Sequence, residues 1–236
     1  MKRFWDIVTV APDGEEHRIL LDGKPMHLPN GGVLRIGPAA LAEGCAEEWR
    51  RAGGAKGGEM SYLDTPLTRI AGTARERIAH DPVTTADAIA RYGESDLLCY
   101  RADAPQALAD LQAARWQPWL DRAEREYGAR ARVTSGVGYL RQHHDWTDAL
   151  RRAVVAHDAY MLAGLGIAVP ALGSLVLGLA LAQGCLDAGE AHALGALEEL
   201  FQVEQWGEDE EAAARRASVA EDIAVADRFM RLARAG

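Results

Sequence analysis

The sequence has few cysteines, and they form none of the patterns that bind zinc or cross-link a secreted domain. Its 236 residues include three, Cys45, Cys99 and Cys185, which are odd in number and far apart. Because no CxxC pair occurs, neither a thiolate zinc site nor a disulfide framework is favoured. We therefore expect three buried thiols in a reducing compartment.

Clusters of basic residues are missing as well. The chain carries 26 Lys and Arg against 35 Asp and Glu, which gives a formal net charge of −9. Basic residues alternate with acids, as in Arg75–Arg77 and Arg122–Arg125, a pattern typical of solvated helix faces. Neutralising phosphates requires clustered Lys and Arg, so we expect no nucleic-acid partner.

A membrane-spanning or signal segment is not evident either. Asp6 interrupts the short apolar start of the chain, which has no run of signal-peptide length. Residues 160–183 carry no charge, but they contain Pro170 and four glycines. We expect Pro170 to begin a second helix, so that this stretch forms two short buried helices. The sequence thus predicts a cytoplasmic protein without membrane insertion.

Turn signals divide the chain into a strand-rich beginning and a helical remainder. Asp13-Gly14 and Asp22-Gly23 lie between apolar runs, which predicts an antiparallel meander. A helix follows from Pro38 to about Arg51. We therefore predict an α+β fold, with a β-rich domain containing one helix over residues 1–60 and an all-helical domain over residues 61–236.

The later helices are predicted from caps and from apolar periodicity. Residues 96–101 are expected to be extended, and a kink or break is expected at Pro118. Asp187 and Glu190 have the spacing of a capping box. One helix is expected to begin at Pro66, and another is expected between a cap at Thr84 or Thr85 and Gly93. The other predicted helices cover about residues 105–127, 145–168, 170–184, 187–207 and 209–233.

The nearest approach to a metal cluster is His143, His144 and Asp145, with Asp148 and His157 further on. Adjacent histidines point in different directions on a regular element, and the HExxH spacing is absent. A polar helix start is the commoner meaning of such a group. The alternative that it leaves open is a small metal-dependent hydrolase or transferase.

The stretch from Leu197 to Gly207 is more informative. On a helix, Glu198, Gln202 and Gln205 form one polar stripe, and Glu199, Val203 and Trp206 form another. Two interpretations fit this spacing. The stripes are either a solvated face with Trp206 closing the core at the helix end, or a surface that binds another protein.

Short stretches in a fixed order relate the chain to a known family. They are Lys2-Arg3-Phe4, Glu48-Trp49, Asp96–Arg101, Leu111-Gln112, Trp116, Pro118, Tyr127-Gly128, Leu197–Glu199, Gln202 and Trp206-Gly207. In this order the chain resembles the assembly chaperones of the F-type ATP synthase catalytic head, found in mitochondria and some bacteria. The resemblance extends over nearly the whole chain.

The resemblance implies a monomeric protein without catalysis, cofactor, metal or small-molecule substrate. Its implied partner is the free α subunit of ATP synthase, whose β-facing surface it shields until the head assembles. The functional acid carried over from the family is Glu198 or Glu199. The implied partner-binding residues are Glu198, Glu199, Gln202, Gln205 and Trp206, and the implied structural residues are Trp49, Tyr100 and Trp116.

Three features depart from the family's pattern, and one of them is the glycine-rich loop at Gly53–Gly58. No organelle-targeting segment precedes Lys2, which indicates a bacterial cytoplasmic member rather than a mitochondrial matrix one, and Phe201 stands where tyrosine is expected. Independently of the family, Leu41, Cys45 and Trp49 are spaced by one helical turn. We therefore predict that the Trp49 indole is buried and holds its helix to the strands.

Overall fold

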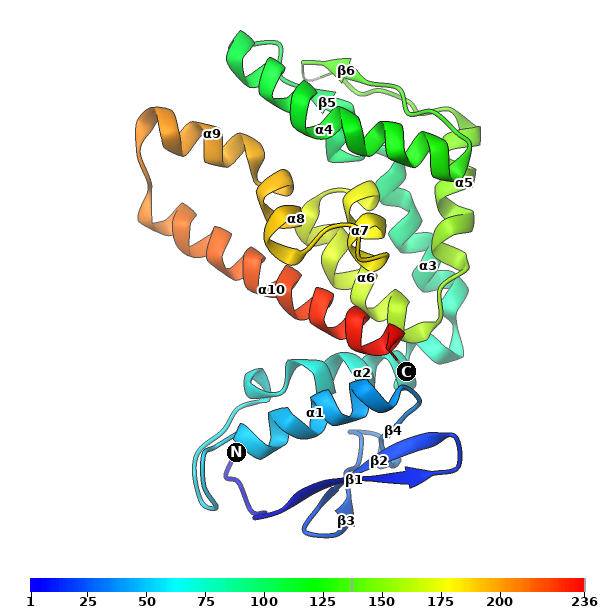
Figure 1. The fold of residues 1–236 in the computed structure, drawn as a ribbon, viewed down its shortest axis with the longest axis vertical. Helices are drawn as coiled ribbons and strands as arrows, with labels where there is room; N and C mark the ends of the chain where they lie inside the picture. The colour runs from blue at the N-terminus through cyan, green and yellow to red at the C-terminus, as the bar shows by residue number, and fades with distance from the viewer. Residues whose placement is uncertain (137, 236) are drawn as a thin grey trace. The chain divides into compact units, whose positions relative to one another are not determined.

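The computed structural model describes residues 1–136 and 138–235 (Figure 1). Antiparallel strands come first and helices follow, which confirms the predicted α+β class. The described residues form two compact units. The first contains residues 1–81, residues 159–164 and the chain from residue 228 on, and the second contains residues 82–158 and 165–227. The domain boundary predicted between residues 60 and 61 stays a prediction.

Strand β2 is the centre of the sheet in the first unit. It pairs in antiparallel fashion with β1, β3 and β4. The turn between β2 and β3 is Asp22-Gly23, where both residues have positive φ (48° and 78°), as a tight two-residue hairpin requires. The turn at Asp22-Gly23 is thus confirmed, and the first hairpin turns at Gly14 and Glu15, with Asp13 paired to Glu16. The strands are β1 (Val8–Asp13), β2 (Glu16–Leu21), β3 (Lys24–Pro25) and β4 (Arg35–Ile36).

Helices α1 (Ala39–Arg51) and α2 (Pro66–Glu76) belong to the first unit. The end of the chain completes this core, since Phe229 and Met230 are fully buried. Helix α1 has Gly44 where a Cβ would lie only 2.6 Å from Leu232 Cδ1. The absence of a side chain at that position lets the last helix approach α1 closely.

The second unit is built from helices, with one short parallel strand pair that the sequence analysis did not predict. Helices α6 and α10 contribute to both units. The elements are α3 (Pro82–Ala90), β5 (Tyr100–Arg101), α4 (Gln106–Tyr127), β6 (Thr134–Ser135), α5 (His144–Val155), α6 (Ala159–Leu172), α7 (Leu175–Ala182), α8 (Ala188–Gly195), α9 (Leu197–Trp206) and α10 (Glu210–Arg234). Single 3₁₀ turns lie at Tyr62–Asp64, Ile78–His80, Arg91–Glu94 and Leu97–Cys99.

Several predicted helix bounds are wrong. The helix expected over 145–168 is two helices, α5 and α6, and the one expected over 187–207 is α8 and α9. At the second break, a Cβ on Gly195 would lie 3.3 Å from Leu172 Cδ2 and 3.4 Å from the Leu172 carbonyl oxygen. Close packing between distant helices therefore sets this break, and apolar periodicity alone does not reveal it.

Proline positions also differ from expectation. Pro170 lies inside α6 instead of beginning the next helix. Pro118 lies inside α4 and does not break it, while a kink there stays a prediction. The break comes at Gly173, whose φ is +63°, and Ser174 then caps α7 with its hydroxyl, which accepts a bond of 3.1 Å from the Leu177 amide. A glycine C-cap followed by a serine N-cap terminates and restarts a helix more effectively than an interior proline.

Two smaller expectations are also wrong. Residues 97–99 form a 3₁₀ turn before the strand β5, so the segment 96–101 is only partly extended. The helix expected to be capped by Thr84 or Thr85 begins at Pro82. Among the thiols, Cys45 and Cys99 are buried as predicted, whereas Cys185 is exposed beside the Arg122 guanidinium. Cys185 lies three residues past the end of α7, where the chain turns at the surface.

The uncharged stretch forms core helices, as predicted. All eight residues of α7 are buried, and α6 is buried along most of its length. In the described part of the chain, no helix combines the length and hydropathy that crossing a bilayer requires.

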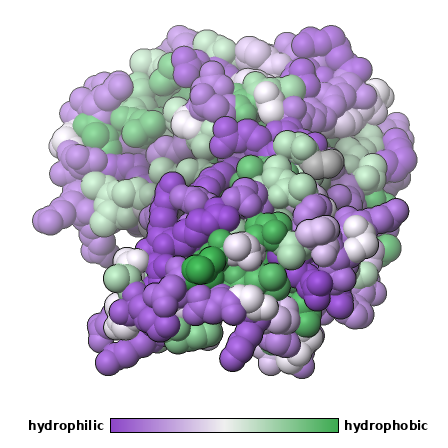
Figure 2. Space-filling model, turned by 60° about the horizontal axis from the view of Figure 1, so that its bottom comes forward, coloured by the Kyte–Doolittle hydropathy of each residue, from purple (hydrophilic) through white to green (hydrophobic). Residues whose placement is uncertain are grey.

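Figure 2 shows one face of the molecule, on which hydrophilic side chains predominate and hydrophobic ones gather in a small area below the middle of the view.

Candidate functional site around helix α9

Helix α9 carries the Leu-Glu-Glu stretch and is held by few buried contacts. Of its ten residues, all described, Leu197 alone is buried, while Leu200, Phe201 and Val203 are half-buried. Glu198 and Glu199 lie in its first turn, where negative charge suits the helix dipole. The helix ends at Gly207, which has φ +89° and ψ 171°, a conformation that glycine adopts at little cost. Helix α9 therefore presents most of its surface to solvent.

The outward face of α9 combines polar side chains with one large aromatic ring. Glu198, Gln202, Gln205 and Trp206 are all exposed, and Trp206 is 77% exposed. The interpretation that Trp206 closes the core is thus wrong. A fully presented indole among acidic and amide groups is typical of protein-binding surfaces, where tryptophan is enriched.

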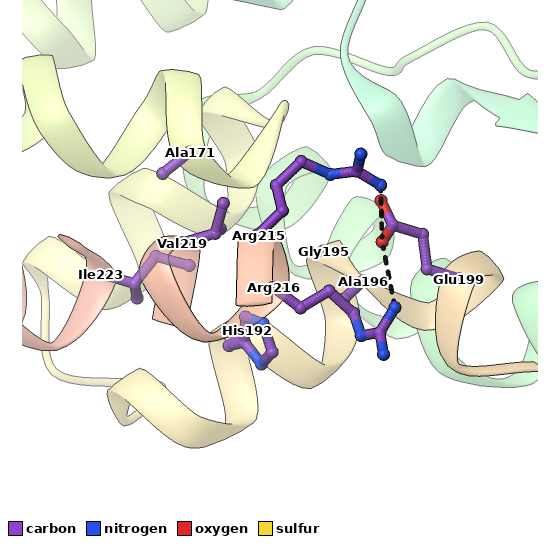
Figure 3. Close-up of a pocket in the computed structure, with 9 residues that line it drawn as sticks. All are labelled: Ala171, His192, Gly195, Ala196, Glu199, Arg215, Arg216, Val219 and Ile223. Atoms are coloured by element: carbon purple, nitrogen blue, oxygen red, sulfur yellow. Dashed lines mark ion pairs between the residues drawn. The ribbon is translucent and has the colours of Figure 1, made fainter. Parts of the chain in front are cut away.

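Glu199 faces a different neighbourhood from Glu198. Its carboxylate lies 3.7 Å from Arg215 Nη2 and 3.7 Å from Arg216 Nη1, both on α10, and Figure 3 shows the two guanidinium groups approaching it from different sides. These residues line a pocket of about 90 Å³. His192, at the end of α8, lines it too, and its buried Nε2 has no hydrogen-bond partner among the described residues.

Sequence reasoning did not identify Arg216, which is only 8% exposed. It donates a hydrogen bond of 2.7 Å to Glu208, just beyond the end of α9. The sequence places Arg215 and Arg216 next to each other on an amphipathic helix, and nothing in the pattern says which of them faces solvent. The tertiary structure distinguishes them: Arg216 is buried and pairs with Glu199 and Glu208, whereas Arg215 is exposed.

Trp116 holds the end of α8, which leads into α9. Its indole nitrogen donates a 2.9 Å hydrogen bond to the Leu194 carbonyl, and the ring is 1% exposed. The Arg101 guanidinium lies 5.3 Å from the centre of this ring and donates to the Gln112 carbonyl. Burial lowers the pKa of Arg101. Members of the Asp96–Arg101 and Gln112–Trp116 stretches are thus brought together beneath the end of α8.

Asp96 is fully buried and binds the start of α7. Its carboxylate accepts hydrogen bonds from the Ser174 hydroxyl (2.8 Å) and from the amides of Leu98 and Val176 (both 3.0 Å). Burial raises the pKa of this carboxyl, although the hydrogen bonds from α7 act in the opposite direction. Asp96 is therefore part of the framework of the second unit.

Trp49 lies in the first unit, and its side chain is buried, as the helical spacing of Leu41, Cys45 and Trp49 predicts. Its indole nitrogen donates a 2.9 Å hydrogen bond to the Thr68 hydroxyl, and its ring centre is 4.9 Å from that of Trp5. Glu48 accepts hydrogen bonds from the amides of Leu67 (2.7 Å) and Thr68 (3.1 Å) and so caps α2. Burial raises the pKa of Glu48. The pair Glu48-Trp49 thus joins α1, α2 and the N-terminal segment.

Tyr100 and the histidine group occupy less constrained positions. Tyr100 is half-buried, and its hydroxyl lies 3.5 Å from the Leu140 amide. His143, His144 and Asp145 are exposed at the start of α5. Within residues 1–136 and 138–235, no three His, Cys, Asp or Glu side chains are grouped as a metal site requires. The described geometry therefore supplies no argument for the hydrolase or transferase alternative.

Comparisons with known proteins bear on this arrangement. The model of the family described as ATP12 chaperone protein matches residues 2–124, more than half of the chain. The crystal structure of Atp12 from Paracoccus denitrificans is 39% identical, with a TM-score of 0.92 and 98% of both chains covered. Protein atp12, mitochondrial, from Schizosaccharomyces pombe is 22% identical over 219 residues, which are 89% of this chain and 75% of the relative.

Proposed function

This chain belongs to the ATP12 chaperone protein family, and we propose that it promotes assembly of the F-type ATP synthase by binding the free α subunit. In this proposal it shields the β-facing surface of that subunit until the catalytic head forms. Membership agrees with the family resemblance seen in the short sequence motifs. The family and both relatives are named as chaperones or as Atp12, and the proposed action needs no catalysis or cofactor.

The observation that carries the proposal is the outward face of α9. An assembly chaperone must cover apolar surface on its client and later release it, which favours a mixed polar and apolar patch over a purely apolar one. Trp206 supplies a large exposed aromatic surface, and Glu198, Gln202 and Gln205 supply charge and hydrogen-bonding groups around it. We therefore propose that this face contacts the α subunit, with Glu199 beside it.

Location and oligomeric state belong to the same proposal. The Schizosaccharomyces pombe relative is named as mitochondrial, and the Paracoccus denitrificans relative is bacterial. We propose that this chain acts as a monomer in a bacterial cytoplasm, where new α subunits are made.

Suppression of α-subunit aggregation tests the proposal directly. Purified α subunit is diluted from urea with and without this protein, and light scattering and the Kd of the soluble complex are measured. Wild type is expected to keep the α subunit soluble near equimolar ratio. Trp206→Ala is expected to weaken binding by about 2 kcal/mol, roughly 30-fold in Kd, because exposed tryptophans often dominate interface energetics.

Tyr139→Ala is the matched control, since Tyr139 is equally exposed (75%) but lies in the loop before α5. It is expected to bind as wild type does. Wild-type protein that leaves the α subunit aggregating, or equal losses in the two variants, would contradict the proposal. Melting temperatures of both variants establish that neither has lost its fold.

A further inference from the structure

Arg216 joins both ends of α9 to α10. Its Nη1 lies 3.7 Å from Glu199, the third residue of α9, and its Nη2 lies 2.7 Å from Glu208, two residues past the end of the helix. We call these two ion pairs the Arg216 bridge. A planar guanidinium can face two carboxylates at once, whereas a lysine ammonium offers a single point charge.

Helix α9 depends on such a tie. With Leu197 as its one buried residue, the helix has little apolar contact to resist local opening. Its C-terminal end is the weaker one, because Trp206 and Gly207 are exposed. The connection to α10 is short: Asp209 follows Glu208 and accepts a 2.9 Å hydrogen bond from the Ala212 amide, which caps α10. The Arg216 bridge therefore closes the α9–α10 hairpin from inside.

The two glutamates of the Leu-Glu-Glu stretch consequently differ. The Glu199 carboxylate is directed at Arg215 and Arg216, as Figure 3 shows. Glu198 is exposed, and it has no ion pair among the described residues. We infer that Glu199 is a positioning residue that holds α9 through Arg216, and that Glu198 is the acid that contacts the client. This inference rests on the proposed function in so far as it concerns the client.

A double-mutant cycle tests the inference. The variants are Glu199→Gln, Arg216→Met and the double variant, with Glu198→Gln as the isosteric control on the neighbouring line of the helix. Two quantities are measured for each: the Kd for the α subunit, and hydrogen exchange of the α9 amides in the free protein. Exchange of α1 amides and the melting temperature report whether the rest of the fold is intact.

We expect Glu199→Gln and Arg216→Met each to speed exchange along α9 and to weaken binding by roughly 5-fold or more. The double variant is expected to be no weaker than Arg216→Met alone, because both changes break the same bridge. Arg216→Lys should restore part of the protection, since it keeps the charge but not the fork. Glu198→Gln should weaken binding without changing exchange.

Other results overturn the inference. Losses in Kd that multiply in the double variant, with unchanged exchange, would make Glu199 a direct contact. Unchanged exchange of the α9 amides in both single variants would show that the Arg216 bridge does not stabilise α9. If wild type does not bind the α subunit, the proposed function fails, and the exchange measurements alone then support or refute the bridge. Arg216 is buried, so Arg216→Met can fail to fold. In that case the milder Glu199→Gln variant provides the test.

Discussion

At the scale of single residues, buried carboxylates at two points bind the starts of helices from elsewhere in the chain. Glu48 accepts hydrogen bonds from the first turn of α2, and Asp96 accepts them from the first turn of α7. Both carboxyl groups have raised pKa values because of burial. Each also accepts a hydrogen bond from a hydroxyl group, that of Thr68 for Glu48 (3.1 Å) and that of Ser174 for Asp96 (2.8 Å).

Replacing Trp49 should damage the first unit. The indole is 7% exposed and hydrogen-bonded to Thr68, so Trp49→Arg loses its packing and buries an unpaired charge. We expect a loss of roughly 3–5 kcal/mol in the free energy of unfolding, measured by urea titration. Trp206→Arg is the control, because that indole is 77% exposed, and it should melt as wild type does. Equal stability of both variants would show that Trp49 has no structural role.

Asp96 should make stability depend on pH. Because burial raises its pKa, the folded chain keeps a proton that the unfolded chain loses above about pH 4. Its contribution is therefore full below that pH and is lost as pH rises through the raised value. Asp96→Asn does not titrate there. We expect the stability advantage of wild type over Asp96→Asn to shrink from pH 4 to pH 7 in urea titrations, and a constant difference would contradict this.

At the scale of elements, glycines set how closely α6 and α7 pack. Gly178 in α7 faces Val169 of α6, and a Cβ built there would overlap the Val169 side chain. Gly166 in α6 faces open space, where an added Cβ meets no atom within 4 Å. The same residue type therefore has a packing role at one position and none at the other.

The two positions make a matched pair for substitution. Gly178→Ala should destabilise the protein by about 1–3 kcal/mol, because the added methyl overpacks the α6–α7 contact. Gly166→Ala should stabilise it by about 0.5–1 kcal/mol, since alanine favours a helix interior over glycine. Thermal melts followed by circular dichroism measure both. Effects of the same sign would show that the α6–α7 contact is looser than described.

At the scale of the whole molecule, the chain returns twice to its first unit. Residues 159–164 and the chain from residue 228 on belong with residues 1–81. Tyr160 donates a 3.5 Å hydrogen bond to the Arg35 carbonyl, and its ring lies 6.4 Å from that of Phe229. A core assembled from three separate segments depends on the end of the chain.

Removing the chain after Asp227 should therefore unfold the first unit. Phe229 and Met230 are fully buried, and losing either side chain from a core typically costs about 2–5 kcal/mol. We expect the truncated protein to lose the near-ultraviolet signal of Trp5 and Trp49 and to aggregate. A chain ending at Arg234 is the control and should fold normally. A stable native spectrum after the longer truncation would show that residues 1–81 fold without the last helix.

Local features of the sequence determined the fold class, the Asp-Gly hairpins, the capping box at Asp187 and the burial of the uncharged stretch. Each follows from forces between neighbours in the chain: positive φ at a turn, a side chain capping the next amides, or apolar spacing. The family, too, is evident from the order of short motifs. Hairpins and caps could thus be predicted from residues a few positions apart.

Tertiary structure decided where α8 gives way to α9 and what each α9 residue faces. The break at Gly195 depends on Leu172, and the difference between Glu198 and Glu199 depends on Arg216 in another helix. Helical spacing places the two glutamates on adjacent lines but does not say which line meets α10. Trp206 fits either core or surface by pattern, and it is exposed at the end of a helix whose single buried residue, Leu197, lies at the opposite end.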